Sequence, residues 1–224
     1  MGKLYVVSTP IGNLGDITLR ALRILKKVDL ILCEDTRVTR KLLNAYGINT
    51  STESYHSQSK VSKETKIVSL LESGKDLALV SDAGTPSISD PGVKLISNLY
   101  SKGFRSIFSV PGASSLTSAL SICPIIFSDF VFIGFLPHKK GRETLIKEMI
   151  DSKRASVFFE SPHRILKTLN LLMKHDKERK IFVARELTKM YEETFYGSIE
   201  ETIEFFESSK EKQKGEFVVV LSKK

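Results

Sequence analysis

Short apolar runs alternate with amphipathic stretches along the first half of the chain. The runs KLYVVS (3–8), LILC (30–33), DLALV (76–80) and SIFSV (106–110) predict strands. Helical spacing follows at 16–27, 37–47 and 61–74, with Asp16 as the expected cap of the first helix and a glycine at the end of the other two. This alternation predicts an α/β fold with a mostly parallel sheet that helices cover on both faces.

A second series begins after CPIIFS (123–128), where the rhythm is interrupted. DFVFIGFLPHKKGRE opens it, strands are expected at 156–160, 180–185, 192–198 and 216–221, and helices at 162–175 and 199–208. Ser161 with Pro162 indicates a helix start, and Ser198 with Glu201 fits a capping box. We therefore expect two α/β domains, residues 1–125 and 126–224, that share a cleft.

Composition limits the class of protein. The 224 residues are 41% apolar and 27% charged, as in folded globular proteins. No apolar run approaches the ~20 residues of a membrane span, and the N-terminus has no signal-peptide core, so we expect a cytosolic protein. Cys33 and Cys123 have apolar neighbours, which favours buried thiols over a disulfide or a metal site. The net charge of +8 favours an anionic partner, most commonly nucleic acid.

Three loops rich in glycine, proline and hydroxyl residues follow strands of the first series, at 9–16, 84–92 and 111–115. The carboxyl ends of parallel strands form the ligand crevice of an open sheet, and three such loops are more than plain connections need. None matches GxxxxGK[ST] or GxGxxG, so a ligand without phosphates is favoured. Backbone groups and small hydroxyls suit an adenosine, and carbonyl oxygens suit a cationic sulfonium.

Eight segments, in one order, carry a resemblance over nearly the whole chain: YVVSTPIGNLGD, CEDTR, SYH, SDAGTPSISDPG, PGASS, FFESPHR, ARELTK and GEFVVVL. Together they resemble the ribosomal RNA small subunit methyltransferase I family, a branch of the tetrapyrrole methylase superfamily that uses S-adenosylmethionine. The resemblance implies a homodimer, a cofactor held between two domains, and 2′-O-methylation of a cytidine in small-subunit (16S) ribosomal RNA without a metal. Where relatives often read YHxHNE, SYHSQSK keeps only His56.

Carried over by position, the resemblance implies a set of cofactor-binding residues. Those in the first domain are Pro10, Leu14, Gly84, Thr85, Ile88, Ser114, Ser115 and Leu116, and those in the second are Phe159, Ala184 and Gly215.

A ribose hydroxyl is a weak nucleophile until a base accepts its proton. The candidates for that role are Glu34, Asp35, His56, Glu160 and Glu186, and the first four are preferred because they follow strands and border the motifs. Each has a structural alternative. Glu34 and Asp35 could cap the next helix, His56 could be a turn residue, and Glu160 could pair with Arg164, as Glu186 could with Arg185 or Lys189.

RNA contacts are expected from basic residues, of which HKKGR (138–142) is the densest cluster. Tyr55 could stack a flipped base, or could be a core or surface residue. HKKGR could equally be a solvated helix start. The candidate RNA-binding residues are Arg37, Arg40, Tyr55, His138, Lys139, Lys140, Arg142, His163 and Arg164. Two other functions stay open: methylation of a tetrapyrrole or another small molecule, and a non-catalytic RNA-binding assembly module.

Overall fold

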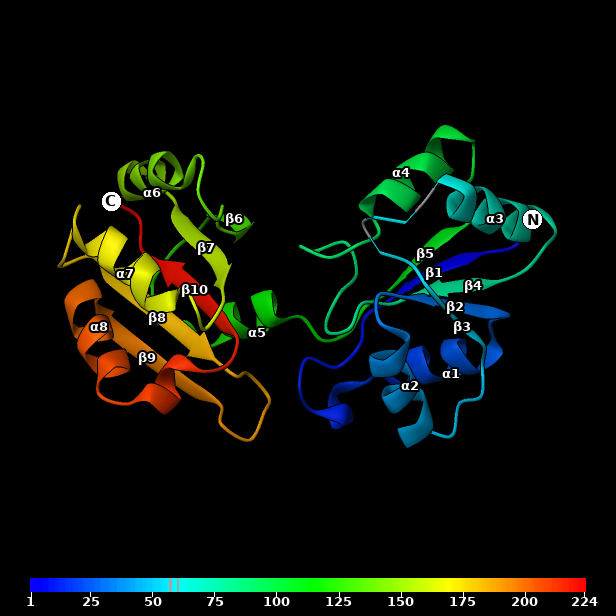
Figure 1. Cartoon of the computed structure of the whole chain (residues 1–224), viewed down its shortest axis with the longest axis horizontal. Helices are drawn as coiled ribbons and strands as arrows, with labels where there is room; N and C mark the ends of the chain where they lie inside the picture. Colours follow the sequence, from blue (N-terminus) through cyan, green and yellow to red (C-terminus); the bar gives the residue numbers. More distant parts are fainter. Residues whose placement is uncertain (57, 60) are drawn as a thin grey trace. The chain divides into compact units, whose positions relative to one another are not determined.

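The structure is a computed structural model that describes residues 1–56, 58–59 and 61–224. The chain divides into two compact units, residues 1–114 and 115–224, each with its own five-stranded sheet (Figure 1). The helix Ser115–Ser121 belongs to the second unit, and residue 125, the expected domain boundary, lies in the segment that follows it. The α/β class predicted from the sequence is confirmed.

The elements of the first unit are β1 (Leu4–Val7), the 3₁₀ turn η1 (Leu14–Asp16), α1 (Leu19–Lys27), β2 (Leu30–Cys33), α2 (Thr36–Ala45), β3 (Thr52–Ser54), α3 (Val61–Glu72), β4 (Leu77–Leu79), α4 (Val93–Ser101) and β5 (Ile107–Val110). Those of the second are α5 (Ser115–Ser121), β6 (Phe130–Phe135), α6 (Arg142–Asp151), β7 (Ala155–Glu160), α7 (Ile165–Met173), β8 (Lys180–Arg185), β9 (Glu193–Ser198), α8 (Ile199–Glu207), η2 (Lys210–Gln213) and β10 (Phe217–Leu221).

The first sheet has the order β3-β2-β4-β1-β5, and every pair in it is parallel. Leu25 of α1 and Leu43 of α2 pack on one face of the sheet. Leu71 of α3 and Leu99 of α4 pack on the other (Figure 1). The predicted parallel sheet with helices on both faces is therefore confirmed.

This strand order fixes where a ligand can bind. From β1 the chain crosses to β2 on one side, whereas from β4 it crosses over β1 to β5 on the other side. The loops that leave the neighbouring strands β1 and β4 thus depart in opposite directions. Ligands of open α/β sheets bind at such a switch point, outside the carboxyl ends of the strands.

The second sheet is mixed, with the order β6-β7-β10-β8-β9. Only β6 and β7 are parallel. Side chains of α6, α7 and α8 pack with Phe158, Val183 and Val219 of the strands in one apolar core, and α5 lies against β10.

Helix starts were predicted with mixed success. Ser198 and Glu201 form the expected capping box at α8. At α1 the expected cap, Asp16, is wrong, because Asn13 starts a 3₁₀ turn that contains Asp16. Ile17 is then extended, and Thr18 caps α1 by accepting from the N–H of Ala21.

Candidate active site

The loops after β1, β4 and β5 meet at the carboxyl edge of the first sheet. Thr9 and Gly84 exchange two backbone hydrogen bonds of 2.9 and 3.0 Å. The hydroxyls of Ser8 and Thr85 lie 2.9 Å apart, and that of Thr85 donates to the carbonyl of Ala113 at 3.2 Å. The expectation that these three loops share one edge is confirmed.

The loop 84–92 has a tightly constrained backbone. Ser87 and Ser89 have φ angles of 71° and 64°, in a region that non-glycine residues occupy at a cost on the order of 1–3 kcal/mol each. Gly92 has a φ of 137°, and a Cβ there would stand 2.4 Å from the Oγ of Ser87. That oxygen is buried and has no hydrogen-bond partner among the described residues. Residues in such conformations cluster at ligand-binding sites.

The expected cofactor-binding residues of the first unit lie on these three loops. Pro10 and Gly84 are buried and Thr85 is half-buried. Leu14 and Ile88 are 47% and 41% exposed, so both present apolar side chains to solvent. Ser114 is half-buried where the third loop ends. The structure therefore brings these residues onto loops that touch one another.

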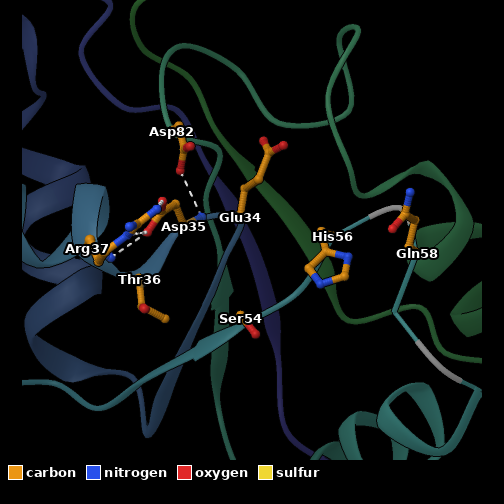
Figure 2. A pocket seen from close by; sticks show the side chains of 8 residues that line it. All are labelled: Glu34, Asp35, Thr36, Arg37, Ser54, His56, Gln58 and Asp82. Atoms are coloured by element: carbon orange, nitrogen blue, oxygen red, sulfur yellow. Dashed lines mark hydrogen bonds and ion pairs between the residues drawn. The ribbon is translucent and has the colours of Figure 1, made fainter.

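A pocket of about 610 Å³ opens beside these loops, at the ends of β2, β3 and β4 (Figure 2). Three of the expected proton acceptors, Glu34, Asp35 and His56, line it, and Asp82 enters it from the loop after β4. The backbone N–H of Asp35 donates to Asp82 at 3.0 Å, which joins the ends of β2 and β4. The remaining lining residues are Thr36, Arg37, Ser54 and Gln58.

The two adjacent carboxylates in this pocket differ in environment. Asp35 is the N-cap of α2: it accepts from the N–H of Arg37 and pairs with the guanidinium of Arg37 at 2.6 Å. Hydrogen bonds from Arg37 lower the pKa of Asp35 to about 2. The helix-capping alternative is thus confirmed for Asp35, and a carboxylate of such low pKa is a poor base at neutral pH.

The pKa of Glu34 is shifted in the opposite direction from that of Asp35. Burial, with the negative charges of Asp82 and Asp35, raises the pKa of Glu34 above its usual value, and His56 lowers it. The carboxylate makes no hydrogen bond or ion pair with another described residue, and Figure 2 shows it turned away from Arg37. Glu34 is thus the carboxylate of this pocket that is both raised in pKa and available to a substrate.

A profile of the family described as Tetrapyrrole (Corrin/Porphyrin) Methylases matches residues 3–203. The ribosomal RNA small subunit methyltransferase I of Thermotoga maritima is 47% identical over 224 residues, the whole of both chains. The chain belongs to the tetrapyrrole methylase family. Within it, the chain belongs with the ribosomal RNA small subunit methyltransferase I proteins, of which the Bacillus subtilis member is 42% identical over 99% of this chain and 75% of that protein.

Solved structures place the fold in the same family. The methyltransferase CobJ matches with a TM-score of 0.71 and 17% identity, over 100% of this chain and 95% of that one. The uroporphyrin-III C-methyl transferase of Thermus thermophilus, complexed with S-adenyl homocysteine, matches with a TM-score of 0.67 and 16% identity, over 98% and 97%. Both units therefore have the tetrapyrrole methylase fold.

The cofactor positions expected after residue 114 lie in the second unit of this family fold. Ser115 and Leu116 begin α5 and are half-buried. Phe159 is half-buried on β7 with ring contacts to Phe132 and Phe135, and Ala184 is buried in β8. Gly215 has a φ of 99°, and a Cβ there would stand 2.4 Å from Glu186. Contacts within the second unit therefore already require glycine at position 215. Their contact with a cofactor stays a prediction.

Glu160 is buried and bonded on all sides. Its carboxylate accepts from the hydroxyl of Thr168 at 2.6 Å and pairs with Arg164 at 2.9 Å and with Arg142 at 3.4 Å. Its side chain has 0% exposure. The structural pairing with Arg164 is present, and a carboxylate held in this way cannot reach a substrate hydroxyl. Glu186 likewise pairs with Lys189, at 2.8 Å.

Two expected RNA-binding residues are corrected by burial. Tyr55 is 3% exposed in the core beneath α3 and donates its hydroxyl to Glu64, so it cannot stack a base. Arg142 is 4% exposed and turns its guanidinium toward Glu160 and Thr168, so it cannot contact a phosphate. Arg164 is mostly buried in the same cluster. The expected RNA-binding residues that are exposed are Arg37, Arg40, His138, Lys139, Lys140 and His163.

Two residues of these arrangements were not singled out from the sequence. Asp82 lies in the motif SDAGTP, and its signal was a carboxylate two residues beyond a buried strand. Thr168 had no signal, because a threonine inside an apolar helix is ordinary. Of the altered segment after His56, residues 57 and 60 lie outside the described part of the chain. Among the described residues, no group of three or more His, Cys, Asp or Glu could hold a metal ion, and no helix is long and apolar enough to cross a membrane.

Proposed function

We propose that this protein transfers the methyl group of S-adenosylmethionine to the ribose 2′-oxygen of a cytidine in small-subunit ribosomal RNA, in the cytoplasm. Family membership makes it a methyltransferase, and its 47% identical relative has that RNA in its name. The proposal rests on one observation: the loop after β4 contacts the other two loops and also supplies a side chain to the pocket that contains Glu34. Gly84 and Thr85 join the loops after β1 and β5, and Asp82 lines the pocket of Glu34.

The loops fit the methyl donor by their chemistry. Residues 9–16, 84–92 and 111–115 contain no Lys or Arg, which suits a cationic sulfonium better than a phosphate. The half-exposed Leu14 and Ile88 offer apolar contact to an adenosine, and the backbone and hydroxyls around Thr85 offer polar contact. Bound S-adenosylmethionine supplies an electrophilic methyl group on sulfur. Pro10, Leu14, Gly84, Thr85, Ile88 and Ser114 would hold it, with Ser115, Leu116, Phe159, Ala184 and Gly215 as the positions implied for the second unit.

Glu34 is the proposed proton acceptor. Positioning of the reacting atoms supplies most of the rate in such a displacement, roughly 7–11 kcal/mol. The ribose hydroxyl still loses a proton, and Glu34 has a raised pKa and no bonds to described residues that would compete for its oxygens. His56, in the same pocket, acts against burial and the charge of Asp82 by lowering the pKa of Glu34.

Labelled S-adenosylmethionine, the purified protein and small ribosomal subunits test the proposal. We expect one methyl group per RNA, which mass spectrometry of nuclease digests places on the ribose of one cytidine. RNA with 2′-deoxycytidine at that position should accept no methyl group. Methylation of that RNA would mean a base acceptor, transfer only to a tetrapyrrole would overturn the RNA substrate, and RNA binding without transfer would indicate an assembly module.

We also propose that the protein is a homodimer. Large apolar side chains are exposed on and beside the edge strand β6, among them Ile126, Phe130, Val131 and Phe135. A second copy would remove this surface from water. Light scattering at micromolar concentration should give about twice the mass of the chain, and a monomer would contradict the proposal.

A further inference from the structure

The buried cluster of Glu160, Arg142, Arg164 and Thr168 pairs charges, and it also holds the backbone of the loops 136–141 and 161–164 by hydrogen bonds. Besides bonding Glu160, Arg142 donates to the carbonyl of Pro137 at 3.2 Å. Arg164 donates to the carbonyl of Leu136 at 2.9 Å. The carboxylate of Glu160 also accepts from the backbone N–H of Ser161 at 2.8 Å. One carboxylate therefore fixes two guanidiniums, and each guanidinium holds the backbone where the loop after β6 begins.

Those two loops carry exposed basic residues. The loop 136–141 presents His138, Lys139 and Lys140 to solvent, and the loop 161–164 presents His163. Because β6 and β7 are parallel neighbours, both loops leave the same edge of the second sheet. The cluster lies directly behind this basic edge.

Stability alone is a weak reason for such a cluster. Burying charges costs several kcal/mol per ion, and apolar replacements are often as stable or more so. Here two arginines share one carboxylate, so the cluster carries an excess positive charge, which the carbonyls of Leu136 and Pro137 help to solvate. The arrangement fixes the backbone at Leu136, Pro137 and Ser161, where the two loops begin.

We infer that Glu160 is a positioning residue for RNA: through Arg142 and Arg164 it holds the two loops so that the ammonium groups of Lys139 and Lys140 and the imidazole of His163 stand in fixed positions toward the phosphates of the substrate. This inference rests on the proposed function. Fixed groups lose less conformational entropy on binding than mobile ones, so the gain should be seen as RNA affinity. Cofactor affinity should not depend on it.

A double-mutant cycle tests the inference. Glu160→Gln and the pair Lys139→Ala with Lys140→Ala are each expected to weaken binding to small-subunit ribosomal RNA by about tenfold. Combined, they should weaken it by no more than about tenfold as well, because Glu160 acts through the loop that carries the lysines. Amide hydrogen exchange in residues 138–141 should accelerate in Glu160→Gln, and the affinity for S-adenosylmethionine should stay within about twofold.

Two further variants separate positioning from plain destabilisation. Asp176→Asn breaks another ion pair, that of the half-buried Asp176 with the buried Arg179 at 2.9 Å, at the opposite end of the strands of the same sheet. We expect it to lower Tm and leave RNA affinity unchanged. Thr168→Val removes the hydroxyl between Arg142 and Glu160 without burying a new charge, and Thr168→Ser retains it. Thr168→Val should weaken RNA binding and Thr168→Ser should not, and this pair decides the matter if Glu160→Gln does not fold.

Each other outcome overturns a specific statement. Effects of Glu160→Gln and the lysine pair that multiply, or an equal loss in Asp176→Asn, would reject the positioning role while RNA methylation stands. No effect of the lysine pair on RNA binding would reject this basic edge as the RNA contact. Absence of RNA binding by the unmodified protein would reject the proposed function together with the inference.

Discussion

Glu34 and Asp82 line one pocket from the ends of neighbouring strands, and burial of Glu34 together with the charge of Asp82 raises the pKa of Glu34. Asp82 also accepts the backbone N–H of Asp35, so it is fixed in place while it acts on Glu34. A carboxylate of raised pKa is a stronger base once ionised, and this relationship gives the pocket its chemical character.

Replacement of Glu34 by Gln should lower the rate of single-turnover methyl transfer by about 10²- to 10⁴-fold, because the proposed proton acceptor is lost. The affinities for S-adenosylmethionine and for RNA should stay unchanged. The matched control is Glu53→Gln, the same change one residue before the pocket-lining Ser54. Glu53 pairs with Lys66 and does not line the pocket. Full activity of Glu34→Gln would remove Glu34 from the mechanism.

The acid limb of the pH–rate profile should move in opposite directions in two variants. As the proposed proton acceptor, Glu34 must be ionised for methyl transfer, so we expect the rate to be present above the pKa of Glu34 and to fall as pH drops through it. Asp82→Asn removes a charge that raises this pKa and should move the limb to lower pH, and His56→Gln should move it to higher pH. Shifts in the same direction would contradict the assignment.

Asp35→Ala should lower Tm by about 2–4 °C through loss of the α2 cap while single-turnover transfer stays within about threefold. The pKa of Asp35 is lowered to about 2, so its contribution to stability is present above its ordinary value of 3.8 and is lost as pH falls toward 2. The Tm difference from the unmodified protein should therefore narrow over that interval. A large loss of rate at full stability would make Asp35 the base.

Thr85→Arg should abolish binding of S-adenosylmethionine, measured by calorimetry with chelator present, because the longer side chain fills the space where the three loops meet. The control is Thr50→Arg at the opposite edge of the sheet. Thr50 is also half-buried and also donates its hydroxyl to a backbone carbonyl, that of Leu25. Unchanged affinity in Thr85→Arg would mean that the loop 84–92 is structural only.

Charge reversal at Lys139 and Lys140 should weaken RNA binding and lower the slope of log K against log salt by about two. The control reverses Lys26 and Lys27, two adjacent exposed lysines at the end of α1, and so changes the net charge by the same amount. Equal effects from both pairs would show that RNA affinity follows overall charge and not the loop after β6.

The sequence supported the parallel sheet because its strands are continuous apolar runs that alternate with helices, and such runs are buried on both faces. It also supported the three loops, since the carboxyl ends of parallel strands share an edge. The strand order came only from the structure, because the pairing of β1 with β4 and β5 joins segments that are far apart in the sequence and leaves no local pattern.

Side-chain roles were harder to predict for a physical reason. Tyr55 and Arg142 were candidates for RNA contact because their residue types bind nucleic acid, but their partners Glu64 and Glu160 lie on other elements. Asp35 and Glu34 are adjacent, and only the folded geometry shows that one caps a helix while the other faces the pocket.

The bond between Ser8 and Thr85 spans 77 positions, and β1 lies between β4 and β5 in the finished sheet. During synthesis β1 leaves the ribosome first, yet its two neighbours follow only after residues 79 and 110. The nascent chain must therefore carry β1 without any partner strand through about a third of its translation and without β5 through about half, a period in which unpaired apolar strands are prone to aggregate. Because the loop after β5 is the last of the three to be made, we expect no nascent fragment that ends before Ala113 to form the proposed cofactor site.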